Sequence, residues 1–159
     1  MSCFPSLQTE THALKCELAS DVMRSFGRLR LKVTGCSMLP VIWPGDILEL
    51  ERAKRSDLTH GEIVLFSRDR RLIAHRVLRT SGSVIVTRGD AMPYIDPVVA
   101  EDELLGRVAC ILRDGIRIRP SKTLSFSQRA VAGLVRSSDF AARVVVGIHG
   151  LRKNRASQS

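Results

Sequence analysis

The sequence predicts a mainly β, antiparallel, partly closed domain with an amphipathic helix on either side. Three observations support this fold class. Between residues 29 and 120, short runs with strand-like alternation recur between tight-turn signals. Outside this region the apolar spacing changes to three or four residues, which is typical of helices. The chain has 159 residues, 44% of them hydrophobic, which is enough for one core.

The first expected element is a helix over residues 11–26, in an N-terminal segment that we place at residues 1–28. Its apolar residues follow one another at i, i+4 spacing: Leu14, Leu18, Val22 and Phe26. Gly27 comes directly after them and is a common helix-ending residue. The spacing therefore indicates an amphipathic helix that ends near residue 27.

Seven strands are expected in the central segment, residues 29–120. They cover residues 29–33, 47–50, 62–67, 72–79, 83–87, 105–112 and 116–119. Turn signals such as Pro44-Gly45-Asp46 and Asp114-Gly115 lie between them. Many short strands joined by tight turns indicate an antiparallel β-domain.

The last segment, residues 121–159, returns to a helical pattern over residues 127–151. Three arginines recur every seven residues and form a stripe: Arg129, Arg136 and Arg143. The apolar residues gather on another side: Val131, Leu134, Val135, Ala142, Val145 and Ile148. A basic amphipathic helix is a candidate for a membrane interface. The alternative is a helix packed on the β-domain with its arginines in solvent.

The chemistry-bearing residues are a serine, a histidine and two carboxylates in that order: Ser37, His75, Asp90 and Asp96. A serine hydroxyl is a poor nucleophile at neutral pH. Chemistry at Ser37 therefore needs a base within hydrogen-bond reach and a third group that orients the base. His75 and one of the aspartates are the candidates for these roles. Taken alone, a histidine in the middle of a strand is more often a core residue.

The block Ser37-Met38-Leu39-Pro40, continued by Val41-Ile42-Trp43-Pro44-Gly45-Asp46, resembles the type I signal peptidases and the related self-cleaving repressor peptidases. The resemblance covers residues 29–108. In most of these peptidases the base is a lysine, whereas the matching strand here carries His75 in Ile73-Ala74-His75-Arg76-Val77. The chain is therefore similar to the Ser-His subgroup, as in the endoplasmic-reticulum and archaeal signal peptidases.

In that subgroup a stretch like Thr87-Arg88-Gly89-Asp90 follows the histidine strand, and a second aspartate comes six residues after the first. Asp90 and Asp96 have this separation. The resemblance implies that Ser37 is the nucleophile, that its backbone N–H serves the oxyanion, and that His75 is the general base. Gly35, two residues before Ser37, is expected to allow a close backbone approach.

The two aspartates are assigned different roles. Asp90 follows Gly89 at a turn, where an aspartate often accepts hydrogen bonds from nearby backbone N–H groups. Asp96 lies in a loop that Pro97 stiffens, and it has no obvious local role. We therefore assign the orientation of His75 to Asp96 and a supporting, structural role to Asp90. The reverse assignment stays open.

These residues predict a serine endopeptidase that cleaves an extended peptide or protein segment through an acyl-enzyme. The resemblance adds a preference for small side chains near the scissile bond. Two other interpretations stay open. One is a regulatory self-cleaving peptidase, although SOS-type repressors carry a DNA-binding domain before the peptidase, and only about thirty residues precede the β-domain here. The other is a non-catalytic peptide- or nucleic-acid-binding module on the same fold.

The cysteines are irregularly spaced and read as free thiols in a reducing compartment. His12 and Cys16 share a helix face, which is how a metal site begins, but the sequence offers no second ligand pair. We therefore expect neither a metal ion nor an organic cofactor.

The net charge of +9 predicts a cationic face that attracts phosphate-bearing partners. The Ser, His, Asp set argues against nucleic acid, which we do not expect as a partner. Residues 1–10 do not resemble a secretory signal, and no apolar stretch reaches the ~20 residues of a membrane helix. We expect a cytoplasmic protein or one attached peripherally to anionic membranes. The oligomeric state stays open.

Overall fold

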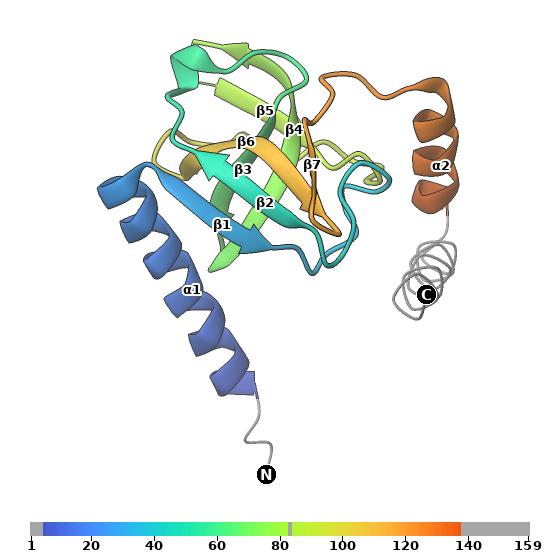
Figure 1. The fold of residues 1–159 in the computed structure, drawn as a ribbon. Coiled ribbons are helices and arrows are strands. Elements are labelled where there is room, and N and C mark those ends of the chain that lie inside the picture. Colours follow the sequence, from blue (N-terminus) through green and yellow to red (C-terminus); the bar gives the residue numbers. More distant parts are fainter. Residues whose placement is uncertain (1–4, 83, 138–159) are drawn as a thin grey trace.

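The computed structural model describes the backbone of residues 5–82 and 84–137, and the side chains of residues 12–82 and 84–135 (Figure 1). Two α-helices flank seven strands, and a short 3-10 helix, η1 (Arg55–Asp57), lies between the second and third strands. The α-helices and strands are α1 (Pro5–Phe26), β1 (Arg28–Lys32), β2 (Ile47–Glu51), β3 (Ile63–Arg68), β4 (Arg71–Ser81), β5 (Val84–Arg88), β6 (Leu104–Arg113), β7 (Ile116–Ile118) and α2 (Phe126–Ser137). The predicted mainly β fold with a helix on each side is confirmed.

The strands form one antiparallel sheet in the order β1-β2-β6-β3-β4-β5, and β7 pairs with β6. The path ends at β1 and β5, so the sheet is not closed. Register shifts interrupt three of the pairings, at Glu49/Leu50, Leu65/Phe66 and Val77/Arg79. Such irregularities bend strands and increase their twist, which lets the sheet curve around its core.

Two apolar clusters form most of the core. The larger one joins the sheet to α1, and its buried members are Met23, Met38, Ile42, Leu48, Leu50, Ile63, Leu65, Val108 and Ile111. The second includes Val64, Phe66, Val77, Ile85 and Val99 from the other end of the strand order. The second cluster underlies β3, β4 and β5, the part of the sheet that carries His75.

The helix α1 does not bury the face that its sequence predicted. Leu14, Leu18 and Phe26 are exposed, with 65%, 61% and 77% of their surface accessible. The buried residues are instead Cys16, Ala19 and Met23, which also share one face of a helix. Gly106 on β6 makes room for this contact, because a Cβ at that position would lie 2.6 Å from Met23 Cε. The predicted helix is present and ends where expected, but it begins at Pro5 and not at residue 11, and its packed face was predicted wrongly.

The helix α2 lies on the other side of the domain from α1 in Figure 1. Its residues Val131 and Val135 pack with Leu39, Trp43 and Ala91. Of the predicted arginine stripe, Arg129 is exposed. The side chain of Arg136, and the predicted helical residues Ala142, Arg143, Val145 and Ile148, lie outside the described residues. The stripe and its membrane contact therefore stay predictions.

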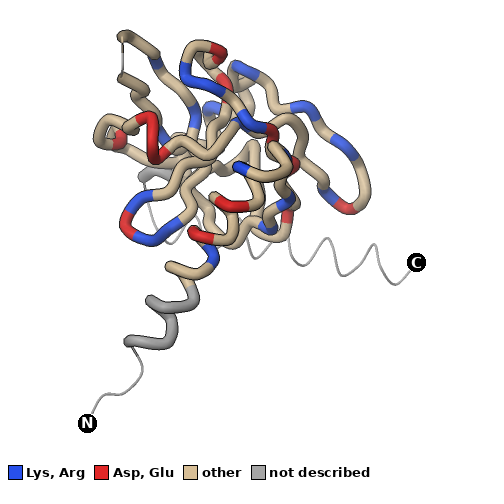
Figure 2. Tube along the Cα trace, turned by 90° about the vertical axis from the view of Figure 1, so that its left-hand side faces the viewer, with Lys and Arg blue, Asp and Glu red and all other residues tan. Residues whose placement is uncertain are grey.

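Charged residues of both signs are mixed along the chain (Figure 2). Many of them pair across strands, as Arg30 does with Glu49 and Arg107 with Glu51. Over the described part of the chain, no helix is long and apolar enough to cross a membrane.

Candidate active site

Ser37 lies in the loop between β1 and β2. The base of this loop is closed by backbone hydrogen bonds from Val33 to Asp46 (2.8 Å) and from Gly45 to Val33 (2.8 Å). Inside it, the Ile42 N–H donates to the Met38 carbonyl (3.0 Å), which makes a compact turn directly after Ser37. These backbone hydrogen bonds order the loop and fix the position of the Ser37 backbone. The Ser37 side chain that extends from it is half-buried.

Asp46 anchors the far end of this loop. Its buried carboxylate accepts hydrogen bonds from the Trp43 N–H (2.7 Å) and from Arg113 on β6 (2.9 and 2.7 Å). Arg113 also donates to the Val41 carbonyl (2.9 Å). A buried carboxylate whose oxygens are hydrogen-bonded makes the segments that donate to it more rigid. Asp46 is thus more than a turn residue, because it fastens the nucleophile loop to the sheet.

His75 occupies the middle of β4, where it pairs with Val64 of β3. Its imidazole is buried, and the Phe66 ring meets it in a T-shaped contact with the centroids 6.1 Å apart. A T-shaped arrangement is one of the favoured geometries of aromatic pairs. The contact with Phe66 therefore supports the orientation that the imidazole has in this structure.

The structure brings Ser37, His75 and Asp96 together. The Ser37 Oγ lies 3.0 Å from His75 Nε2, and Asp96 Oδ2 lies 2.7 Å from His75 Nδ1. The side chains of His75 and Asp96 are 8% and 19% exposed. One imidazole therefore contacts a hydroxyl on one ring nitrogen and a carboxylate on the other, in a largely water-excluded position.

Asp96 is held against β5. Its N–H donates to the Thr87 carbonyl (3.0 Å), and the buried Thr87 hydroxyl donates to Asp96 Oδ2 (2.6 Å). Partial burial acts to raise the pKa of Asp96. The hydrogen bonds from His75 and Thr87, and the charges of His75 and Arg68, outweigh burial, so that the pKa lies below its usual value. The carboxylate is thus kept ionised beside the imidazole.

Asp90 lies in a different environment. Its carboxylate accepts two hydrogen bonds from Arg76, at 2.8 and 2.7 Å, and both side chains are buried. The same guanidinium donates to the carbonyls of Gly61 and Ser121, each at 2.7 Å. Asp90 therefore belongs to a buried ion pair that joins four segments of the chain.

The close backbone approach expected at Gly35 occurs at Gly89 instead. Within the described residues, nothing lies within 4 Å of where a Cβ of Gly35 would be. A Cβ at Gly89 would lie 2.7 Å from the Ser37 carbonyl oxygen and 3.0 Å from His75 Nε2. The neighbouring Ala91 N–H donates to that same carbonyl (2.9 Å). The turn after β5 therefore lies close to the Ser37 backbone and to the His75 imidazole.

A comparison with protein families matches residues 2–108 to the family described as Peptidase S24-like. The match covers more than half of the chain. The chain belongs to the Peptidase S24-like family. A comparison with curated proteins found no match, and neither did one with solved structures.

The match to the Peptidase S24-like family includes Ser37, His75, Asp90 and Asp96. It ends inside β6, so that β7 and α2 lie beyond it. Val131 and Val135 of α2 nevertheless pack beside Leu39, two residues after Ser37. Part of what surrounds the nucleophile loop therefore comes from outside the family region.

The structure adds supporting residues that the sequence did not indicate. Thr87 and Gly89 lie in the motif that suggested the resemblance, but nothing in their spacing showed that they contact Asp96 and His75. Phe66 reads as an ordinary core residue of a buried strand. Arg68 reads as the solvent-exposed end of a strand. Their roles depend on contacts between strands that are far apart in sequence.

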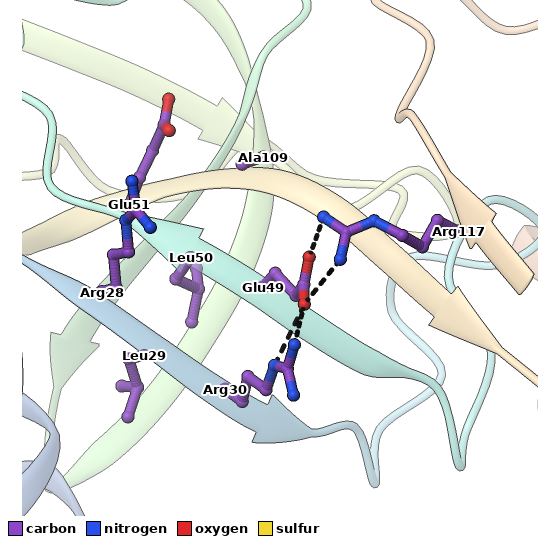
Figure 3. Close-up of a pocket in the computed structure, with 8 residues that line it drawn as sticks. All are labelled: Arg28, Leu29, Arg30, Glu49, Leu50, Glu51, Ala109 and Arg117. Carbon is purple, nitrogen blue, oxygen red and sulfur yellow. Dashed lines mark hydrogen bonds and ion pairs between the residues drawn. The ribbon is translucent and has the colours of Figure 1, made fainter. Parts of the chain in front are cut away.

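A shallow pocket of about 490 Å³ lies elsewhere, on the face of β1, β2 and β6 (Figure 3). Figure 3 shows Glu49 between Arg30 and Arg117, which it pairs with at 3.0 and 3.2 Å. The residues that line this pocket do not include Ser37, His75 or Asp96. In the described ranges, no group of three His, Cys, Asp or Glu residues is placed to hold a metal ion.

Proposed function

We propose that this protein is a serine-type endopeptidase in which Ser37 is the nucleophile, His75 the general base and Asp96 the group that orients the base. One observation carries the proposal: a single imidazole lies 3.0 Å from Ser37 Oγ and 2.7 Å from Asp96 Oδ2. Both distances are within hydrogen-bond reach, as proton transfer requires. Membership of a peptidase-like family supports the same reaction class.

The geometry suggests how the proton moves. Asp96 accepts the Nδ1–H of His75, which leaves the Nε2 lone pair facing the Ser37 hydroxyl. The hydroxyl proton passes to Nε2 while Oγ forms a bond to the carbonyl carbon of the scissile peptide. When the C–N bond breaks, Nε2 gives this proton to the leaving amine, and the acyl group stays on Ser37.

Hydrolysis of the acyl-enzyme repeats these steps with water. Water gives a proton to His75 Nε2 and adds its oxygen to the ester carbon. The bond from that carbon to Ser37 Oγ then breaks, and Oγ takes the proton back from Nε2 as the carboxylic acid leaves. The ionised Asp96 stabilises the imidazolium that exists in both halves of the reaction.

For the substrate we propose an extended peptide segment with small side chains near the scissile bond. The resemblance to signal peptidases supports this preference, and an extended peptide matches the way strands are recognised at a sheet. A histidine base suits such a reaction near neutral pH, because it does not need the apolar pocket in which a lysine loses its proton.

The reaction class can be tested with a fluorophosphonate probe, which forms a covalent bond with the oxygen of an activated serine and releases fluoride. Wild type should be labelled, Ser37→Ala lacks the atom that carries the label and should stay unlabelled, and His75→Ala should be labelled several orders of magnitude more slowly. In a peptide-cleavage assay each single variant should lose turnover by several orders of magnitude, and the double variant should be little worse than either, because the two groups act as a unit. Ser81→Ala, at an exposed serine at the end of β4, is the matched control and should label like wild type. Labelling that persists in Ser37→Ala would exclude Ser37 as the nucleophile.

Mass spectrometry separates action on other chains from self-cleavage. Wild type is incubated with a peptide library containing small residues, and both the library and the protein are analysed. Cleaved library peptides that increase with enzyme concentration support an endopeptidase acting on other chains. Shortening of its own chain at a rate independent of concentration, without cleaved peptides, would instead indicate a self-cleaving regulator.

A further inference from the structure

The loop that carries Asp96 connects β5 and β6 and has almost no regular structure of its own. On its β5 side it is held by the Asp96 N–H on the Thr87 carbonyl (3.0 Å) and by the Val99 N–H on the Ile85 carbonyl (2.9 Å). In both bonds the loop donates an N–H group and β5 accepts it. The carbonyls of Pro97 and Val98, which lie between these two bonds, need hydrogen-bond donors from a different part of the chain.

Arg68, the last residue of β3, supplies that donor. Its Nη1 donates to the Pro97 carbonyl (3.0 Å) and its Nη2 to the Val98 carbonyl (2.7 Å). Its Nε donates to Glu103 Oε1 (2.7 Å), and Nη2 also pairs with the other carboxylate oxygen. A guanidinium has five N–H donors in a rigid fork, so that one side chain can fix several acceptors at once.

Glu103 holds the guanidinium in place. Its carboxylate also accepts the Ala100 N–H (2.8 Å), and its backbone carbonyl accepts the Ser67 N–H (2.9 Å). The Arg68 side chain is 18% exposed, and the Glu103 side chain is 23% exposed. The pair is therefore shielded from most of the solvent that weakens surface ion pairs.

Arg68 also contacts Phe66, whose ring packs against the imidazole. Its guanidinium carbon lies 5.4 Å from the centroid of the Phe66 ring, which is within cation–π distance. The Phe66 ring makes the T-shaped contact with His75. One guanidinium thus contacts the loop that carries the carboxylate and the ring that braces the imidazole, and it touches neither member of that pair.

We propose that Arg68 is a positioning residue, which holds the Asp96 carboxylate against His75 Nδ1 by fixing the carbonyls of Pro97 and Val98, the two residues that follow Asp96. The inference rests on the proposed function, since it assigns Arg68 a part in the same reaction. The charge of Arg68 acts in the same direction, because it helps to keep the pKa of Asp96 below its usual value.

The test compares Arg68→Gln with a matched arginine. Arg107 on β6 also donates to a carboxylate at 2.7 Å, but its acidic partners are Glu51 and Glu62. Arg68→Gln should slow fluorophosphonate labelling about 10- to 100-fold, which is typical of small displacements of a catalytic group. Arg107→Gln should label like wild type. Equal rates in folded Arg68→Gln and wild type would overturn the proposal.

A double variant distinguishes positioning from general support. Once the carboxylate is gone, Arg68 has nothing left to position, so Asp96→Asn and Asp96→Asn/Arg68→Gln should label at the same rate. If Arg68→Gln slows labelling by the same factor in both backgrounds, Arg68 acts on the fold and the proposal is wrong.

Proton NMR gives a readout that does not depend on peptidase activity. The His75 Nδ1 proton, hydrogen-bonded to Asp96, should give a low-field resonance in wild type and in Arg107→Gln, and it should broaden or shift in Arg68→Gln. If wild type takes up no probe, the proposed function fails while this resonance still tests Arg68. An unchanged resonance in Arg68→Gln would overturn the positioning role.

Arg68→Lys covers the case in which Arg68→Gln does not fold. Lysine keeps the charge for Glu103, but its single ammonium cannot reach Glu103 and both carbonyls together. A smaller loss of labelling rate in the same direction is expected. Labelling of Arg68→Lys at the wild-type rate would count against the proposal.

Discussion

Asp90 and Asp96 lie at the two ends of one short segment, and their carboxylates have different partners. Asp90 faces Arg76, with both oxygens hydrogen-bonded by the guanidinium and its side chain 4% exposed. Asp96 faces His75 and Thr87 through a single oxygen, and its side chain is 19% exposed. The first carboxylate is held in an ion pair that joins loops, and the second contacts a group that can exchange a proton.

The difference shows how the same residue type can serve the fold or the chemistry. A carboxylate held bidentately by arginine is fixed in place and charge, which favours stability. A carboxylate beside an imidazole can select the tautomer and stabilise the charged ring while the proton moves at the other nitrogen. We therefore expect substitutions at Asp90 to reduce stability and substitutions at Asp96 to reduce activity.

The largest effect is expected for Asp96→Asn. An amide presents the wrong hydrogen-bonding group to Nδ1 and favours the unproductive tautomer, which in serine triads lowers turnover on the order of 10⁴-fold. Probe labelling should fall by about this factor, while the free energy of unfolding in guanidinium chloride should fall only slightly. Asp102→Asn, at an exposed aspartate of the same loop, is the control and should label normally. Near-normal labelling of Asp96→Asn would remove Asp96 from the orienting role.

Asp90→Asn should give the second-largest effect, this time on stability. Removing one partner of a buried ion pair leaves the other charge uncompensated, which typically costs about 3–5 kcal/mol of unfolding free energy. Equilibrium unfolding in guanidinium chloride measures the loss of unfolding free energy. The exposed pair of Asp21 and Arg24, 3.1 Å apart, is the matched control, and Asp21→Asn should cost at most about 1 kcal/mol.

A double variant sharpens this second prediction. Replacing both members of the buried pair, as in Arg76→Met with Asp90→Leu, removes the uncompensated charge and should be less destabilising than either single change. If Asp90→Asn instead unfolds like wild type but loses probe labelling, the roles of the two aspartates are reversed.

Gly89→Ala comes third, because it acts on both the fold and the site. The added methyl would lie 2.7 Å from the Ser37 carbonyl oxygen, a backbone atom that cannot move without shifting the nucleophile. Labelling should fall about 10²-fold, as expected for a misplacement of about 1 Å. Gly35→Ala, where the described residues leave open space, should label like wild type. Similar losses in both variants would mean that loop flexibility, and not the contact at Gly89, limits the reaction.

Much of the fold could be predicted from the sequence because its signals are local. Each strand has its own alternation and its own turn, so that strand positions follow without knowledge of their partners. The packed face of α1 could not be predicted this way. The spacing of Leu14 and Leu18 is as helical as that of Cys16, Ala19 and Met23, and which set is buried depends on contacts with the sheet, such as the close approach of Met23 to Gly106.

The candidate site divides in the same way. Ser37, His75 and the two aspartates stand out because their order and spacing match a known family. Thr87 and Arg68 do not stand out, because their partners lie across strands and in a loop whose path the sequence does not reveal. The choice between Asp90 and Asp96 also needed the structure, since it depends on where Arg76 points.

The smallest expected effect concerns acid stability. Since the pKa of Asp96 is lower in the folded protein than its usual value near 3.9, the ionised carboxylate stabilises the fold at neutral pH. This contribution is fully present above the pKa of the unfolded state and is lost as pH falls through the folded pKa. The difference in unfolding free energy between wild type and Asp96→Asn should therefore be constant near neutral pH and shrink below about pH 4. Thr87→Val removes one of the hydrogen bonds that lower the pKa of Asp96, so in that variant the loss of stability on acidification should be smaller and should be complete at a higher pH. If the difference in unfolding free energy between wild type and Asp96→Asn grows on acidification, burial and not these hydrogen bonds controls the pKa of Asp96.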